Sequence, residues 1–284
     1  MLRGKGNLDP TIVRGRIGIV DAALIRCLEN FKNNAENLSV YVTESIYQNI
    51  IPIDHIHEFL TELSPVDGVI TGHFELERIL HQPGATLNHL PGQELTRYAA
   101  ARILKKVDIE SNGHRQENEK LAAVEELLKI YGANPKERRL KVGLVSGSFD
   151  LIHLGHVRYI KAAKKQCDVL VVATMSTGSI RQQEKNSRGD RPIYSQEDRI
   201  KLLSALKSVD HIVVFPELDC KEVIKNLKPN FFIKNANDIA RQIVKEECRL
   251  VESLNGKVIV SNDDLQYSST DIIDYIRKAS KGAE

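Results

Sequence analysis

The 284-residue sequence has few cysteines, no extended apolar segment and no excess of charge of either sign. Its four cysteines are scattered without C-x-x-C spacing, so neither a disulfide framework nor a zinc site is indicated, and we expect reduced thiols. The N-terminal residues MLRGKGNLDP contain no apolar core typical of a signal peptide. No later stretch approaches the ~20 apolar residues that a membrane-spanning helix needs. By default, these absences favour a cytoplasmic protein that does not bind a membrane.

The charges are nearly balanced along the chain. A formal net charge of +2, with no long basic run, gives no electrostatic reason to expect a nucleic-acid partner. The hydrophobic fraction of 42% can build real cores, and the length suits one large or two ordinary domains. We therefore expect small-molecule ligands. No metal site is predicted, because the histidines of the first half form no recognisable ligand set: His55, His57, His73, His81 and His89.

The first half alternates strand-like and helix-like segments. Apolar runs at 17–20, 38–43 and 69–70 predict strands, and the patterns at 22–31 and 53–63 predict helices. The second half repeats this order. Such alternation predicts an α/β fold with a Rossmann-like, doubly wound parallel sheet in each of two tandem domains.

Three pairs of segments align the two halves as an internal repeat: RIGIV at Arg16 with KVGLV at Lys141, NLSVYVTES at Asn37 with DVLVVATMS at Asp168, and ELSPVDGVI at Glu62 with ALKSVDHIV at Ala205. The offset grows from 125 to 131 to 143 residues, so the first copy would lack 6 and then 12 residues, in loops that carry two histidines and a basic cluster in the second copy. The first copy would keep the scaffold without the chemistry. The alternative is a chance alignment, because strand–helix–strand units share apolar periodicity.

This reading predicts a degenerate domain at residues 1–110, a linker at 111–138 and a catalytic domain at 139–284. Within the linker, residues 116–131 have the apolar spacing of an amphipathic helix. The degenerate domain would act as a built-in partner of the catalytic one. The chain would then be an internal pseudo-dimer, with a homo-oligomer as the alternative.

The second half opens with KVGLVSGSFDLIHLGH, residues 141–156, in which an apolar run ends in small residues and two histidines follow. The run 142–145 predicts a strand buried in a parallel sheet. Gly147 lets the main chain approach an anion closely. His153 and His156 lie three positions apart, so one helical turn places both imidazoles at the start of the next helix, where amides and the helix dipole also attract phosphate. We therefore predict a polyphosphate site here.

Within this segment, GSFDLIHLGH resembles the signature of the cytidylyltransferase-like nucleotidyltransferases, G-(small)-F-D-x-x-H-x-G-H. The resemblance implies an enzyme in which the phosphate of a small molecule attacks a nucleoside triphosphate and pyrophosphate is released. His153 and His156 would be catalytic and would stabilise transition-state charge. Magnesium is implied by the family and by no carboxylate cluster in the sequence. The remaining motif residues would bind the nucleotide: Gly147, Ser148, Phe149, Asp150 and Gly155.

A basic loop, RQQEKNSRGDRP, follows the next strand of the second half. Its continuation, GDRPIYSQEDR, resembles the GDSRPVxPxxxR-type segment in the adenylyltransferase domain of the ADP-heptose synthases. That resemblance carries Arg199 over as a catalytic residue, and we expect Lys185 to act with it. Arg188 and Arg191 would contact the substrate. A solvated basic face is the alternative for each of these side chains.

The segment after residue 230 matches a weaker motif of the family. Lys234 ends a predicted strand and occupies the first position of a KGGD-like segment. Asn235 and Ala236 stand where two glycines are expected, whereas Asp238 preserves the acid. The resemblance implies that Lys234 and Asp238 bind the nucleotide, but the departure leaves recognition of the base or the acceptor open.

A second weak motif lies near the end of the chain. Ser268, Ser269 and Thr270 precede an amphipathic helix, and on the sequence alone they are capping residues. The resemblance adds a role as nucleotide-binding residues, because the family's S-S/T-T element presents hydroxyls to the β- and γ-phosphates. Both roles are compatible, since a helix N-terminus binds phosphate.

Together these resemblances imply transfer of AMP or CMP from ATP or CTP to a phosphorylated small molecule such as a sugar phosphate. The GDRP segment and Lys234 favour ATP and an ADP-sugar product. One alternative is a CTP-dependent cytidylyltransferase acting on glycerol 3-phosphate or on choline or ethanolamine phosphate, which shares GxFDxxHxGH. Another is a nucleotide-binding regulatory relative without turnover, which the replacement of two glycines by Asn235 and Ala236 would suit.

Overall fold

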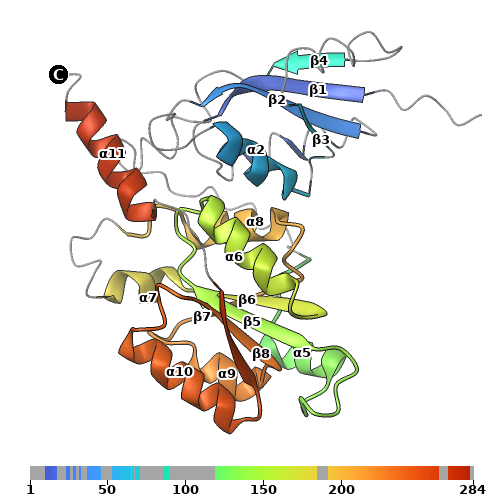
Figure 1. Cartoon of the computed structure of the whole chain (residues 1–284), viewed down its shortest axis with the longest axis vertical. Coiled ribbons are helices and arrows are strands. Elements are labelled where there is room, and N and C mark those ends of the chain that lie inside the picture. The colour runs from blue at the N-terminus through green and yellow to red at the C-terminus, as the bar shows by residue number, and fades with distance from the viewer. Residues whose placement is uncertain are drawn as a thin grey trace, which may run out of the picture. The chain divides into compact units, whose positions relative to one another are not determined.

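The computed structural model of the chain describes residues 10–17, 24–25, 28–29, 32, 37–45, 53–64, 66, 68–70, 86–89, 119–183, 191–261 and 268–281 (Figure 1). The chain divides into two compact units. The first comprises Met1–Val107 and Thr270–Glu284, and the second comprises Asp108–Ser269. The sequence placed the last fifteen residues in the catalytic domain, whereas this division groups them with the first unit.

The second unit is built around a five-stranded parallel sheet with the order β7-β6-β5-β8-β9. Its strands, in chain order, are β5 (Val142–Gly147), β6 (Val169–Met175), β7 (His211–Phe215), β8 (Phe231–Asn235) and β9 (Lys257–Ser261). From β5 the chain adds β6 and β7 on one side, and then returns to add β8 and β9 on the other. The predicted Rossmann-like, doubly wound sheet is confirmed, and the winding reverses between β5 and β8.

Helices cover both faces of this sheet (Figure 1). Those of the second unit are α5 (Val124–Tyr131), α6 (Leu154–Lys164), α7 (Thr177–Gln182), α8 (Gln196–Ala205), α9 (Lys221–Leu227) and α10 (Gln242–Ser253). α6 and α8 lie on one face, and α5, α9 and α10 lie on the other. The sheet is therefore buried on both sides, as the continuous apolar sequence of β5 and β6 requires.

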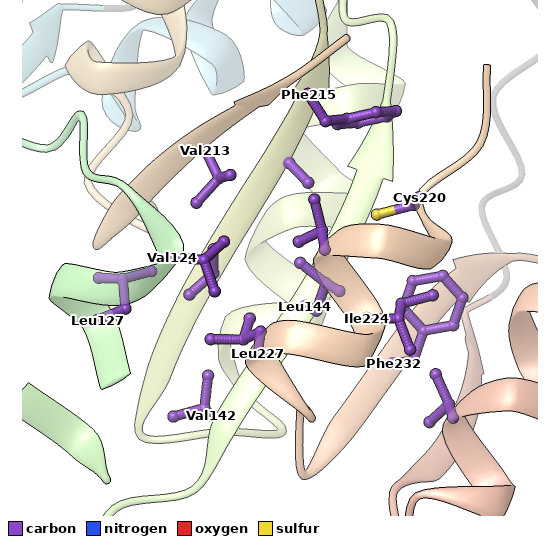
Figure 2. Close-up of a cluster of buried hydrophobic side chains, with 14 of the residues drawn as sticks. Val124, Leu127, Val142, Leu144, Val213, Phe215, Cys220, Ile224, Leu227 and Phe232 are labelled. Atoms are coloured by element: carbon purple, nitrogen blue, oxygen red, sulfur yellow. The ribbon is translucent and has the colours of Figure 1, made fainter. Parts of the chain in front are cut away.

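The core on the α5 and α9 side fixes the strand that leads to the candidate site (Figure 2). Val142 and Leu144 of β5 belong to one buried cluster with Leu127 of α5 and with Ile224 and Leu227 of α9. Each of these side chains is at most 1% exposed. Full burial of one such side chain contributes about 1.5–3 kcal/mol, so β5 is a rigid support for the turn at its carboxyl end.

The segment before α5 pairs with the β7 edge of the sheet. Leu121 forms a parallel bridge with Ile212, whose amide donates to the Lys120 carbonyl at 2.7 Å. The amide of Ala122 in turn donates to the Ile212 carbonyl at 3.0 Å. This extended pairing is why the helix begins at Val124, although the apolar pattern predicted a helix from residue 116.

In the first unit the described residues form a four-stranded parallel sheet with the order β3-β2-β1-β4. Its strands are β1 (Pro10–Ile17), β2 (Asn37–Ser45), β3 (Gly68–Ile70) and β4 (Thr86–His89). Helix α2 (Ile53–Thr61) buries Ile56, Phe59 and Leu60, as its spacing predicted. The strand order is the same as that of β7-β6-β5-β8 in the second unit.

The strand pairing corrects the sequence alignment of the two halves. The structure describes the first strand at Pro10–Ile17, so it starts seven residues before the predicted strand at 17–20, of which residues 18–20 lie outside the described residues. Thr11 pairs with Leu38 as Val142 pairs with Val169, which gives both strands the same offset of 131 residues. The predicted six-residue loss before β2 was therefore wrong. At this offset a degenerate first copy would have Ala22 in place of His153 and the buried Ile25 in place of His156, so the histidines would be replaced rather than deleted. A degenerate first copy stays a prediction.

Candidate active site

The candidate site begins in the turn at the carboxyl end of β5. Phe149 has a positive φ of 45°, which is unusual for a residue with a side chain, and its ring is 2% exposed. A Cβ at Gly147 would lie 3.2 Å from this ring. Gly147 therefore leaves space for Phe149 to fold back over the turn. This packing gives the glycine a structural reason in addition to the predicted close approach of a phosphate.

The two motif histidines meet at the start of α6, as their spacing predicted. His153 is the N-cap residue, and its Nδ1 accepts a hydrogen bond from the Gly155 amide at 3.1 Å. His156 lies one turn later, and its Nδ1 accepts from the His153 amide at 3.4 Å. The ring centroids are 4.1 Å apart, and Phe149 packs edge-on against His156. The imidazoles therefore serve first as caps for two helix-terminal amides.

These hydrogen bonds also set the tautomer of both rings. Because each Nδ1 accepts a hydrogen bond from an amide, the single N–H of each ring in its neutral form is on Nε2. Burial and, as a smaller cause, the nearby positive charge of Arg191 together lower the pKa of His156 to about 4. His156 is therefore neutral near pH 7, and its Nε2–H can donate a hydrogen bond.

Asp150, which was expected to bind nucleotide, is occupied by the chain itself. Its carboxylate accepts the amides of Ile193 and Tyr194, each at 2.9 Å, and pairs with Arg191 Nε at 2.5 Å. The residue is 1% exposed. Asp150 thus holds the end of the predicted basic loop against the turn that follows β5. Of that loop's predicted side chains, Arg191 is described, whereas Lys185 and Arg188 lie outside the described residues.

Arg199 lies beneath the turn and not in contact with solvent. It is 0% exposed, in the first turn of α8, after the N-cap residue Ser195. Its Nη1 donates to the Ser148 carbonyl at 2.9 Å, to Thr174 Oγ1 at 2.8 Å and to the Met175 carbonyl at 2.7 Å. Burial lowers its pKa to about 10, although Asp150 opposes the shift. Arg199 joins the ends of β5 and β6, which gives it a scaffold role, and its catalytic role stays a prediction.

Lys234 reaches the same end of the sheet from β8. Its Nζ donates to Ser146 Oγ at 2.8 Å and lies 3.1 Å from Glu247 Oε2. The Lys234 side chain is 7% exposed and that of Glu247 is 5% exposed. Asp238, the other expected residue of this segment, forms a half-exposed ion pair with Arg241 at 3.2 Å. Glu247 escaped the sequence analysis, because nothing in the motif points to a residue thirteen positions after Lys234.

Comparison with known proteins agrees with this geometry. Residues 144–275 match the family model named cytidylyltransferase-like. This part of the chain is a cytidylyltransferase-like domain. It is a domain of the nucleotidyltransferase class, and the sequence-based recognition of that family is confirmed.

The similar proteins each match about half of the chain. The bifunctional protein HldE of Aliarcobacter butzleri (strain RM4018) is 32% identical over 155 residues, which are 53% of this chain and 32% of that protein. The bifunctional protein HldE of Campylobacter concisus (strain 13826) is 36% identical over 143 residues, which are 49% and 29%. The match thus spans about a third of the length of these relatives. A crystal structure of the lipopolysaccharide core biosynthesis protein from Thermoplasma volcanium GSS1 is 25% identical and covers 45% of this chain and 99% of its own, with a TM-score of 0.36.

The serine-rich element near the end of the cytidylyltransferase-like domain also touches the motif segment. Ser269, the first residue of α11 (Ser269–Lys281), donates from Oγ to the Leu151 carbonyl at 2.9 Å. It thereby contacts the loop that joins the turn after β5 to α6. Ser268 is exposed, and Thr270 falls in the segment that groups with the first unit. Phosphate binding by these three residues stays a prediction.

No group of three or more His, Cys, Asp or Glu side chains among the described residues could hold a metal ion. None of the helices in the described part of the chain is long and apolar enough to cross a membrane.

The lowered pKa of His156 predicts a pH-dependent stability of the cytidylyltransferase-like domain. An unfolded histidine has a pKa of about 6.5, whereas that of His156 in the fold is about 4. As the pH falls, the unfolded state binds the proton first, so the stabilisation is complete above pH ~6.5 and is lost progressively towards pH ~4. Between pH 7.5 and 4.5 we expect the wild-type protein to lose about 2 kcal/mol more free energy of unfolding than His156→Asn. Urea titrations with equal losses for both proteins would contradict this.

Proposed function

We propose that the chain transfers the AMP moiety of ATP to the phosphate of a small molecule, such as a sugar phosphate, and releases pyrophosphate. The observation that carries the proposal is the pair of imidazoles at the amino end of α6. His153 and His156 both use Nδ1 to accept main-chain amides, so both can donate from Nε2. Two imidazole N–H donors beside a helix N-terminus suit an anionic transition state.

In the proposed reaction, a phosphate oxygen of the acceptor attacks the α-phosphorus of ATP. A new P–O bond forms, the bond from the α-phosphorus to the bridging oxygen of the β-phosphate breaks, and pyrophosphate leaves with that electron pair. No general base is needed, because the acceptor phosphate is already ionised. The contribution of the protein is therefore to position the two phosphates and to stabilise the charge that develops between them.

The residues around the histidines hold the segments of the site in place. Asp150 holds residues 191–194 on the turn, which places Arg191 near enough to His156 to lower its pKa. Arg199 fixes the ends of β5 and β6 from below. Asp150 already accepts two amides and pairs with Arg191. Magnesium, which the family resemblance implies, would supply positive charge beside the phosphate oxygens of the substrate.

The choice of nucleotide and acceptor is tested by turnover. The protein is incubated with each of the four nucleoside triphosphates and a panel of sugar phosphates and polyol phosphates, and pyrophosphate release is measured. We expect kcat/KM to be highest with ATP, at least about tenfold above CTP, which comes second. The resemblance of the GDRP segment to the ADP-heptose synthases favours this order.

Other outcomes of this panel have distinct meanings. A preference for CTP with an alcohol phosphate would move the protein to the CTP-dependent cytidylyltransferases and leave the reaction class standing. Nucleotide binding without pyrophosphate release from any pair would contradict the proposed activity and favour a regulatory role. His156→Ala serves as the background control, since any release that persists at the wild-type rate in this variant does not come from the site.

A further inference from the structure

The inward face of α10 carries a carboxylate in an otherwise apolar stripe. Val244, Glu247 and Val251 are the buried residues of this helix, and they follow one another at helical spacing. Glu247 is 4% exposed. Burying a carboxylate is costly unless it is paired, so its partners show why it is there.

Each oxygen of this carboxylate has a different environment. Oε1 accepts a hydrogen bond from the amide of Cys220 at 2.8 Å. Oε2 lies 3.1 Å from the ammonium group of Lys234, but among the described residues it accepts no hydrogen bond of acceptable geometry. The thiol of Cys220 stays neutral, because burial raises its pKa to about 12. Glu247 therefore keeps capacity to accept one more proton donor at Oε2.

This pair lies where the winding of the sheet reverses. Lys234 stands near the carboxyl end of β8 and donates to Ser146 near the carboxyl end of the neighbouring strand β5. β5 and β8 flank the point at which the strand order changes direction. In open α/β sheets, ligands bind in the crevice outside the carboxyl ends of the strands at this point. A buried ion pair adds little stability by comparison with apolar side chains of similar size. Stability alone therefore does not explain why Lys234 and Glu247 lie at this point of the sheet.

We infer that Lys234 and Glu247 form a hydroxyl-binding pair at the switch point, with Glu247 as a residue that determines specificity. The carboxylate cancels the charge of the lysine and repels phosphate, so the pair does not suit an anionic group. A ligand hydroxyl matches it on both sides, because its oxygen accepts from Nζ and its hydrogen is donated to Oε2. The inference rests on the proposed function for the source of that hydroxyl, which is either the ribose of the triphosphate or the sugar of the acceptor.

The test compares ligands that differ by one hydroxyl. Binding of ATP, 2′-deoxy-ATP and 3′-deoxy-ATP to the full-length protein is measured by calorimetry, and so is binding of glucose 1-phosphate, mannose 1-phosphate and their monodeoxy analogues. We expect the wild-type protein to bind one hydroxylated ligand about tenfold or more tightly than its deoxy analogue. In Glu247→Gln this ratio should fall to near one, because the amide oxygen stays with the Cys220 N–H and the NH2 group, which can only donate, takes the place of Oε2 beside Lys234. The ligand whose ratio changes identifies the ribose or the sugar as the source.

Two further variants keep the result interpretable. Glu246→Gln is the matched control, since Glu246 is the neighbouring residue of α10, pairs with Lys221 at 2.8 Å and is 42% exposed. We expect it to keep the wild-type ratio. If Glu247→Gln does not fold, as judged by circular dichroism, the double variant with Lys234→Met and Glu247→Met removes the buried pair without leaving one charge unpaired. It should fold and show no preference for the hydroxyl.

The outcomes separate this inference from the proposed function. A purely structural Glu247 would weaken both members of each ligand pair equally, and an unchanged ratio in Glu247→Gln would overturn the inference. So would a wild-type protein without hydroxyl preference for any probe. Loss of the preference in the variant, together with no pyrophosphate release from the wild-type protein, would contradict only the proposed transfer. Turnover by the wild-type protein with an unchanged ratio in Glu247→Gln would contradict only the hydroxyl-binding pair.

Discussion

Replacing His156 with alanine is expected to lower kcat at least about a hundredfold while the fold stays intact. Loss of one donor to the charge of a transition state costs about 3 kcal/mol or more. The substitution removes the Nε2–H donor and a 3.4 Å contact with the His153 amide, but it leaves the cap that His153 forms with Gly155. α6 should therefore still form. The measurement is pyrophosphate release with the best substrates of the panel, together with a thermal melt.

The matched control for this experiment is another histidine of the same unit. His211 begins β7, at the amino end of the strands, and its Nε2 shares a 2.7 Å hydrogen bond with the Tyr131 hydroxyl. We expect His211→Asn to keep kcat within about twofold of the wild type, because it is remote from the turn after β5. Normal turnover in His156→Ala would remove the central claim. Equal loss of kcat in both variants would indicate a general loss of folded protein.

Replacing Arg199 with methionine is expected to lower the free energy of unfolding by about 3 kcal/mol or more. The change removes the guanidinium donor from three acceptors, which are the carbonyls of Ser148 and Met175 and the hydroxyl oxygen of Thr174, although the Ser148 carbonyl keeps a 3.3 Å hydrogen bond from that hydroxyl. An unsatisfied buried polar group costs about 1–3 kcal/mol, and these effects are only partly additive. The loss is measured by urea unfolding at pH 7.5. Activity should also fall, since the ends of β5 and β6 carry the site.

Two variants distinguish this scaffold role from a direct role in the reaction. Arg199→Lys keeps a positive donor and should retain part of the stability. Arg241→Met removes a half-exposed ion pair with Asp238, and a change below about 1 kcal/mol is expected. If Arg199→Met kept the wild-type stability but lost turnover, Arg199 would be a catalytic residue, as its resemblance to the family implied.

The sequence was sufficient for the strand, turn and helix of the motif because the interactions there are local. His153 caps α6 through an amide two positions away, and the contact between His153 and His156 follows from one helical turn. The doubly wound parallel sheet was also predicted, since alternating strands and helices favour it, whereas the order of its five strands comes from the structure. Asp150 shows the limit of this approach. Its partners, Ile193 and Tyr194, lie more than forty residues away, and no local pattern marks them.

The misplaced first strand has a similar cause. The run RIGIV resembles KVGLV in its alternation of apolar residues, but a strand is fixed by its pairing with neighbours as well as by its own pattern. The structure pairs Pro10–Ile17 with β2, and only the end of that strand overlaps the predicted one. The helix of the linker region was predicted too early for the same reason, because residues 120–122 meet their partner, Ile212, some ninety positions later.

The bridge between Leu121 and Ile212 covers part of an edge strand that would be exposed if the second half of the chain were produced without residues 120–122. An uncovered edge strand offers main-chain donors and acceptors to any other extended chain, and it is a common starting point for aggregation. Residues 120–122 occupy part of the β7 edge, and α5 adds Val124 and Leu127 to the core. A fragment that starts at the predicted boundary, residue 139, would lose this cover and would expose the apolar surface behind it. We therefore expect a fragment that folds on its own to begin before Lys120 and to include the segment that the sequence predicted as a linker.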